Sequence, residues 1–192
     1  MQKPHDFETA QGYTDFEALE LGGHICRIMS VEERKSAAGK DMIAVSLDIA
    51  EGKQANYYSN QYKNNTKADK KWGCIVYQLV LDAEGNTNKG FKTFIDAVEK
   101  SNAGFVTQWG ANFGDQFKGK LIGGVFGREQ YRNANQELKF ATKCMSFKTV
   151  EQIRKGVPVP KDKLLQGVQA QPTNSTAFTP TTNFEEDDDL PF

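Results

Sequence analysis

The sequence predicts a mainly β domain in which five strands curl into a small barrel, with two helices between the third and fourth strands. Three observations lead to this fold class. Apolar and polar residues alternate with a period of two in several segments, which is typical of half-buried strands. Between residues 67 and 101 the period lengthens to that of a helix. Glycines recur within the predicted strands, where they permit the sharp coiling of a small barrel, at residues 22–23, 119, 123, 124 and 127.

Three strands are predicted before the helices. The first covers Gly23–Arg34 and is followed by the basic loop KSAAGK at residues 35–40. The second covers residues 41–50, where apolar side chains occupy every odd position from 43 to 49. The third covers NYYSNQY at residues 56–62, a segment rich in residues that favour strands.

Two helices are predicted next. The first begins near Lys67 and ends at Gly85-Asn86; its helically spaced apolar residues are Trp72, Ile75, Val76, Leu79 and Val80. The second has Asn88 as its candidate N-cap and ends at Asn102–Gly104, with one apolar face made by Phe91, Phe94, Ile95 and Val98.

Two strands and a short helix complete the domain. The strands cover residues 120–132 and 137–147, and a turn at residues 133–135 joins them. A helix over Val150–Lys155 follows, with Thr149 as N-cap and Gly156 after its end. Five strands with helices between the third and fourth is the order of an OB-fold, a five-stranded Greek-key barrel. A two-layer α+β sandwich is the alternative that this order leaves open.

Charge is distributed unevenly along the chain. The formal net charge of −1 hides 23 basic and 15 acidic residues within residues 21–163, a net charge of +8 there. We therefore divide the chain into an acidic N-terminal lead (residues 1–20), the basic OB-fold domain (21–163), a linker (164–184) and an acidic tip (185–192). The linker is rich in Thr, Asn, Gln and Pro, a composition that predicts disorder.

Several classes of protein are excluded by what the sequence lacks. Its apolar runs are too short for a membrane span, and the N-terminus has no secretory signal. Three cysteines without CxxC spacing argue against disulfides or zinc and fit a reducing cytoplasm. Two isolated histidines and the absence of a GK[ST] motif give no catalytic group. We expect a cytoplasmic protein that is not an enzyme and has no cofactor or metal.

Binding of single-stranded DNA fits the residues better. Lysine and arginine neutralise phosphates, and aromatic faces stack on bases without strong sequence preference. The candidate residues fall on the elements that an OB-fold presents to an oligonucleotide. They are Lys35, Lys40, Tyr57, Tyr58, Tyr62, Lys63, Lys70, Lys71, Trp72, Phe126, Arg128, Arg132, Lys139 and Lys143. Core packing remains the alternative for Trp72, for one of Tyr57 and Tyr58, and for Phe126.

The last eight residues, EEDDDLPF, are the most specific pattern in the chain. An acidic run ending in Leu-Pro-Phe resembles the C-terminal tip of bacterial single-stranded DNA-binding proteins (SSBs). The resemblance implies an OB-fold domain, a disordered linker and a tip that binds replication, recombination and repair proteins. It also implies that the tip can fold back onto the basic groove when DNA is absent. The implied partner-binding residues are Asp187, Asp188, Asp189, Leu190, Pro191 and Phe192.

The body of the chain resembles a second group. The segments SAAGKDMIAVSLDI, GFKTFIDAVEKSNAGF and FKGKLIGGVFGREQY are similar to early-region proteins of phages and prophages of Gram-positive bacteria. The two inserted helices depart from a minimal SSB domain, which leaves the oligomeric state open, a homo-oligomer included. Two other functions also stay open: an OB-fold protein-interaction adaptor, and a single-strand annealing or recombination accessory factor.

Overall fold

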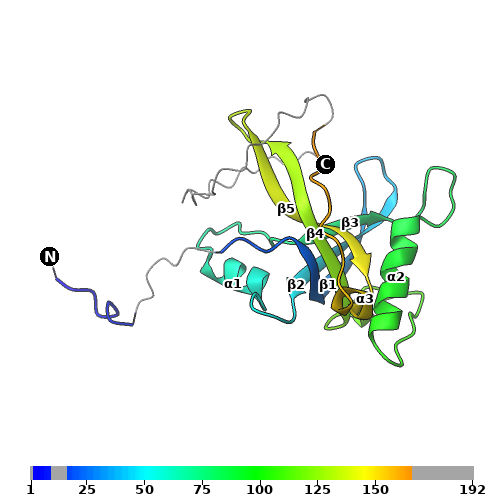
Figure 1. Ribbon diagram of the computed structural model, residues 1–192, viewed down its shortest axis with the longest axis horizontal. Coiled ribbons are helices and arrows are strands. Elements are labelled where there is room, and N and C mark those ends of the chain that lie inside the picture. The colour runs from blue at the N-terminus through cyan, green and yellow to red at the C-terminus, as the bar shows by residue number, and fades with distance from the viewer. Residues whose placement is uncertain (1, 10–16, 166–192) are drawn as a thin grey trace.

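The computed structural model describes residues 2–9 and 17–165 (Figure 1). Its elements are β1 (Gly22–Lys35), β2 (Asp41–Ile49), α1 (Tyr57–Asn64), β3 (Ile75–Leu79), α2 (Lys89–Ser101), the short 3-10 helix η1 (Asp115–Phe117), β4 (Leu121–Arg132), β5 (Leu138–Lys148) and α3 (Val150–Arg154). The strands form one antiparallel five-stranded sheet in the order β3-β2-β1-β4-β5. Over these residues β3 and β5 remain edge strands, so the sheet is not closed into a barrel.

Six predicted elements are confirmed: β1, β2, α2, β4, β5 and α3. The predicted caps explain where the helices start. The Asn88 side chain accepts a hydrogen bond from the Gly90 N–H at α2, and Thr149 forms a capping box with Gln152 at α3. None of the described helices is long and apolar enough to cross a membrane.

The prediction is wrong for residues 56–80. The expected third strand, residues 56–62, lies in helix α1 and its N-cap, and the expected helix from Lys67 to Gly85-Asn86 contains strand β3. The cause of the first error is Asp48 on β2, whose buried carboxylate accepts hydrogen bonds from the N–H groups of Tyr58 and Ser59. This long-range contact provides an acceptor for the first backbone N–H groups of α1, and it outweighs the strand preference of the tyrosines.

The two errors offset each other in the strand count. Residues 75–79 pair with Met42–Ser46 of β2, so β3 takes the place of the strand expected earlier in the chain. One long helix, α2, rather than two, therefore lies between the third and fourth strands. Gly73 precedes β3 because a Cβ there would lie 2.9 Å from a ring carbon of Tyr58.

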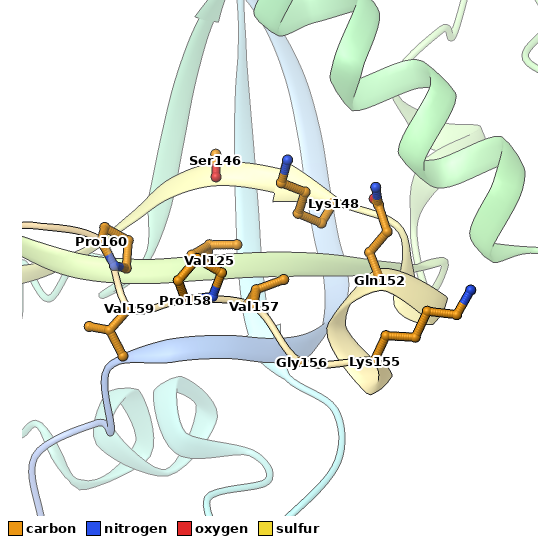
Figure 2. A pocket seen from close by; sticks show the side chains of 10 residues that line it. All are labelled: Val125, Ser146, Lys148, Gln152, Lys155, Gly156, Val157, Pro158, Val159 and Pro160. Atoms are coloured by element: carbon orange, nitrogen blue, oxygen red, sulfur yellow. The ribbon is translucent and has the colours of Figure 1, made fainter.

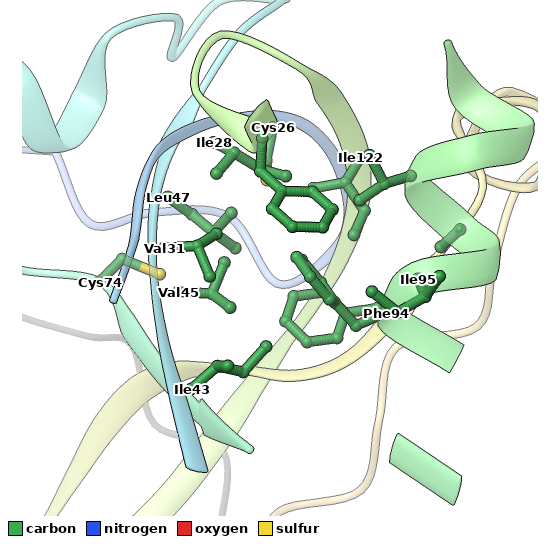
Figure 3. Packing of buried hydrophobic residues seen from close by; sticks show 14 of the residues in the cluster. Cys26, Ile28, Val31, Ile43, Val45, Leu47, Cys74, Phe94, Ile95 and Ile122 are labelled. Atoms are coloured by element: carbon green, nitrogen blue, oxygen red, sulfur yellow. The ribbon is translucent and has the colours of Figure 1, made fainter. Parts of the chain in front are cut away.

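The core lies between the sheet and α2, with η1 and α1 closing its sides. In Figure 3 Phe94 and Ile95 extend from α2 toward apolar side chains of the sheet. Phe94 contacts the rings of Phe117 and Phe147 at centroid distances of 5.2 and 5.3 Å. Leu19 is also buried in this core, so the ordered domain begins before the predicted boundary at residue 21.

Strand β1 changes partners along its length. Its first half, Gly22–Arg27, pairs with β4, and the part from Cys26 to Lys35 pairs with β2 across a register shift near Ile28. The shift bends the strand, as β-bulges do. As a result β4 and β5 extend beyond β1 as a hairpin, which projects from the body in Figure 1. We call this hairpin, residues 127–132 and 138–143, the β4–β5 arm.

Candidate nucleic-acid interface

One face of the arm combines cations with an aromatic ring. Alternation along β4 places Phe126, Arg128 and Arg132 on the same face, as predicted. The register adds Phe140, which lies opposite Gln130 on β5. The Arg128 guanidinium carbon lies 5.2 Å from the centre of the Phe140 ring, a cation–π contact. Phe140 is 39% exposed, so this pair is accessible from solvent.

A second aromatic and cationic group lies between α1 and β3. Tyr62 and Trp72 contact each other with ring centroids 5.6 Å apart, and the Lys70 ammonium lies 4.5 Å from the centre of the Tyr62 ring. The indole N–H of Trp72 donates to the Leu47 carbonyl over 2.7 Å, which fixes the indole. We call Tyr62, Lys70 and Trp72 the Tyr62 cluster; all three are half-buried.

The Tyr62 cluster and the arm face are connected through the core. Tyr58 precedes Tyr62 by one helical turn and stacks on Phe126, with centroids 6.4 Å apart and an interplanar angle of 27°. Phe126 in turn lies on the face of β4 that continues outward to Arg128. The two groups therefore lie on one side of the sheet, and together they form the candidate interface.

Two predicted stacking residues are not available at the surface. Tyr58 is 4% exposed and Phe126 is fully buried, so neither ring presents a face to solvent in this structure. They support the interface from below, because α1 covers the inner end of the arm face. Tyr57 is also partly enclosed: burial raises the pKa of its hydroxyl, and the ring packs against the core. Trp72 packs against the edge of the core, as the core-packing alternative predicts, and part of its side chain is also exposed to solvent.

The predicted cations fall into two groups. Several form ion pairs: Lys35 with Asp41 at 2.6 Å, Lys143 with Glu129 at 3.0 Å and Lys139 with Glu137 at 3.7 Å. The register places Lys139 and Lys143 on the face of the arm opposite Phe140, so the structure does not bring them together with the arm face. Lys40 and Lys63 have no carboxylate partner among the described residues, and Arg132 donates to the Gln136 carbonyl. Lys71 is exposed on the segment that carries the Tyr62 cluster.

The two turns of the predicted interface point in the same direction. Figure 1 shows the β1–β2 turn, which carries Lys40, and the β4–β5 turn, which follows Arg132, both at the upper side of the view. The β4–β5 hairpin extends past the N-terminal end of β1, and the β1–β2 turn follows its C-terminal end. The bend in β1 brings both turns to one side.

A segment after α3 contacts the arm along the free edge of β4. We call residues 157–165 the strap. Lys163 pairs with Glu129 in a parallel bridge, with backbone hydrogen bonds to Arg128 and Gln130 of 2.9 and 2.8 Å. Asp162 accepts two hydrogen bonds from the Arg128 guanidinium, at 2.9 and 2.6 Å. The strap thus orients Arg128 on the arm face.

Glu129 connects the strap to the arm electrostatically. Its carboxylate accepts a hydrogen bond from Lys163 at 2.5 Å and pairs with Lys143, and these two contacts lower its pKa from the ordinary value of 4.5. Because the pKa is lowered in the folded chain, the charged carboxylate stabilises the fold at pH values above 4.5. That contribution is lost as the pH falls below 4.5 and through the lowered pKa.

The substitution Glu129→Gln is expected to lower the free energy of unfolding at neutral pH by about 1 kcal/mol or less, because both ion pairs reach solvent. The difference from the native chain should disappear as the pH falls below 4.5. Denaturant unfolding of both chains over a pH series measures this. A difference that stays constant with pH would show that the ion pairs do not contribute to stability.

A groove on the opposite face of the sheet is separate from the candidate interface. It has a volume of about 500 Å³ and lies between β4, β5 and the start of the strap (Figure 2). Its lining is mostly apolar, from Val125, Val157 and the prolines of the strap. Val125 adjoins Phe126 on β4 and therefore points to the other face.

The metal-ligating side chains and the thiols of the described residues do not form a metal-binding group. No group of three or more metal-ligating side chains occurs within residues 2–9 and 17–165. The three cysteines are free thiols. Burial raises the pKa of Cys144 to about 12 and raises those of Cys26 and Cys74 as well, so these thiols remain protonated at neutral pH and are poor nucleophiles.

The predictions did not include several exposed aromatic residues, among them Phe140 and Trp109. Phe140 could have been found from the hairpin register, which places it beside Arg128 once the turn at residues 133–136 is fixed. Trp109, which is 68% exposed, lies in a Gly- and Asn-rich connection that has no periodic pattern, so the sequence gives no signal for it. The predicted partner-binding residues Asp187–Phe192 lie outside the described residues.

Comparison with known families finds no matching family model, and comparison with curated proteins finds no match.

Proposed function

We propose that this protein binds single-stranded DNA along the candidate interface, without strong sequence preference. In this proposal the acidic tip recruits replication, recombination or repair proteins to the bound strand. The open sheet is then an OB-type barrel whose third and fifth strands do not pair. The strand order supports this assignment, because pairing β3 with β5 would close the same order into a five-stranded barrel.

The observation that carries the proposal is the presence of two aromatic and cationic groups on one side of the sheet. Stacked bases need exposed ring faces, and phosphates need cations at intervals beside them. The Tyr62 cluster supplies Tyr62 and Lys70, and the arm supplies Phe140 and Arg128. Both groups lie on the side of the sheet that α1 covers, and Tyr58 and Phe126 connect them. A duplex hides its base faces, so the same surface favours single strands.

The existing ion pairs do not prevent phosphate binding. Lys35 pairs with Asp41 at the surface, where such a pair contributes about 1 kcal/mol or less. Arg128 would exchange its two hydrogen bonds with Asp162 for a phosphate. A phosphate can replace a carboxylate at that cost. Lys40 and Lys63, which lack carboxylate partners among the described residues, are available without any exchange.

The proposal is tested by measuring the affinity of the full chain for oligo(dT) and for duplex DNA over a salt series. With about four phosphates neutralised, the logarithm of the oligo(dT) association constant should fall with the logarithm of salt concentration at a slope of about −3. Duplex should bind more weakly at every salt concentration. Equal affinity for duplex, or a slope near zero, would contradict the proposal.

The same titration with a chain that lacks residues 185–192 tests the proposed role of the acidic tip. Removal of five acidic side chains should leave the affinity for oligo(dT) unchanged or higher, because the tip and DNA carry the same charge. Capture of replication or repair proteins by the DNA-bound chain should be lost. Weaker oligo(dT) binding by the shortened chain would argue against a recruiting role for the tip.

A further inference from the structure

Trp109 is an exposed indole with one face already occupied. It lies in the loop between α2 and η1 and is 68% exposed. One ring face stacks on Phe113, with centroids 5.3 Å apart and an interplanar angle of 21°. Its ring also makes an edge contact with Phe91 of α2 at 6.2 Å. The indole is therefore held in one orientation while much of it faces solvent.

The loop that carries Trp109 is firmly attached to the domain. Gln108 and Gln116 exchange two hydrogen bonds of 2.8 Å, from the Gln108 N–H to the Gln116 side chain and from that side chain to the Gln108 carbonyl. The Thr107 N–H donates to Glu99 on α2 over 2.9 Å. Gly114 packs so closely on β1 that a Cβ there would lie 2.1 Å from the Val31 carbonyl oxygen. The indole is thus presented on a rigid support.

Two features of this loop are not explained by folding stability. An indole that stays largely in water contributes little of the free energy that its burial would supply. The Thr107 hydroxyl is buried and has no hydrogen-bond partner within the part of the chain that the structure describes. Features that cost stability in a well-packed segment are expected where the segment serves a binding function.

The position of Trp109 relates it to the candidate interface. Its partner Phe91 lies in the first turn of α2, which is the upper end of that helix in Figure 1. The β1–β2 and β4–β5 turns project toward the same side. A strand that crosses the candidate interface and passes the β1–β2 turn would therefore continue toward this end of α2.

We propose that Trp109 stacks on a base of the bound single strand and extends the interface beyond the β1–β2 turn; this inference rests on the proposed function. The surroundings favour a nucleic acid over a protein surface. Apart from Val106, the exposed residues of the loop are small or polar, whereas a tryptophan that anchors a protein partner sits in an apolar, desolvated patch. Lys89 and Lys92 are exposed beside Phe91; Lys92 pairs with Asp96, and Lys89 adds positive charge for a phosphate.

Tryptophan fluorescence tests the contact directly, because the chain has only two tryptophans. The full chain and its Trp109→Phe variant are titrated with oligo(dT). The emission lost through the substitution is that of Trp109, and it should be quenched on binding, since a stacked base quenches an indole. Oligo(dT) that binds without changing the Trp109 contribution would overturn the proposal.

Affinity provides the second measurement. The substitution Trp109→Ala should weaken oligo(dT) binding about 5- to 100-fold, the range of one base–aromatic stack. Trp109→Phe should retain most of the affinity, because a phenyl ring also offers a π-face. Val106→Ala is the matched control: it removes the other exposed apolar side chain of the loop, 66% exposed, and should leave affinity unchanged.

The outcomes separate this inference from the proposed function. If the native chain binds oligo(dT) and Trp109→Ala binds equally well, the inference is wrong, and a protein partner becomes the remaining class of ligand for the indole. If Trp109→Ala and Val106→Ala weaken binding equally, the loop rather than the indole is responsible, and the inference is also wrong. If the native chain does not bind oligo(dT), the proposed function and the inference fail together.

Discussion

Replacing Asp48 with Ala is expected to lower the free energy of unfolding by about 3 kcal/mol. The Asp48 carboxylate is only 3% exposed, although it lies on a strand. It accepts hydrogen bonds from the N–H groups of Ile49 and Tyr58, both at 2.9 Å, and from the N–H and hydroxyl of Ser59. Alanine would leave these buried donors without an acceptor and remove a negative charge from the N-terminus of α1.

Thermal and denaturant unfolding of the Asp48→Ala chain measure this loss, which corresponds to a melting temperature lower by roughly 6–12 °C. Ser59→Ala is the matched control, because it removes one hydroxyl donor and leaves the carboxylate in place; we expect a loss of about 1 kcal/mol. A loss for Asp48→Ala no greater than that for Ser59→Ala would show that the carboxylate does not hold α1 in position.

The largest functional effect is expected from removing the two arginines of the arm face. The combined substitution Arg128→Ala and Arg132→Ala should weaken oligo(dT) binding about 10- to 30-fold at 0.1 M salt and make the salt slope shallower by about 1.4. Both side chains are exposed on the hairpin, so their removal leaves the core intact. The salt series described above measures both quantities.

A matched control separates position from net charge. The combined substitution Lys53→Ala and Lys100→Ala removes the same charge from exposed positions outside the candidate interface. We expect it to change affinity less than threefold, because screening at 0.1 M salt confines the effect of exposed charges to about 10 Å. Equal losses in the two variants would mean that binding depends on net charge alone and not on the arm.

The strands could be predicted wherever a local pattern and the final contacts agree. Residues 41–50 alternate cleanly and form β2, and Asn88 caps α2 as its side chain predicts. Residues 56–80 could not be predicted, because their structure depends on Asp48 and on the free edge of β2. Those contacts join positions far apart in the chain, and the propensity of the tyrosines for strands points the other way.

The candidate site was predictable in part for a similar reason. Alternation along a strand shows that Phe126 and Arg128 share a face, and this is confirmed. It does not show what covers that face, and α1 covers Phe126 while leaving Arg128 exposed. Asp162, which holds Arg128, lies 34 positions along the chain and has no distinguishing pattern. The orientation of Trp109 likewise depends on its ring contacts with Phe113 and Phe91, which only the folded structure brings next to it.

Hydrogen exchange in the presence of saturating oligo(dT) tests the central claim most directly, because it locates the bound strand on the folded protein. The account predicts added protection in residues 62–72 and in the β4–β5 arm. It predicts no change in the groove between β4, β5 and the start of the strap on the opposite face. Protection confined to that groove, or spread evenly over the domain, would contradict the assignment of the nucleic-acid interface.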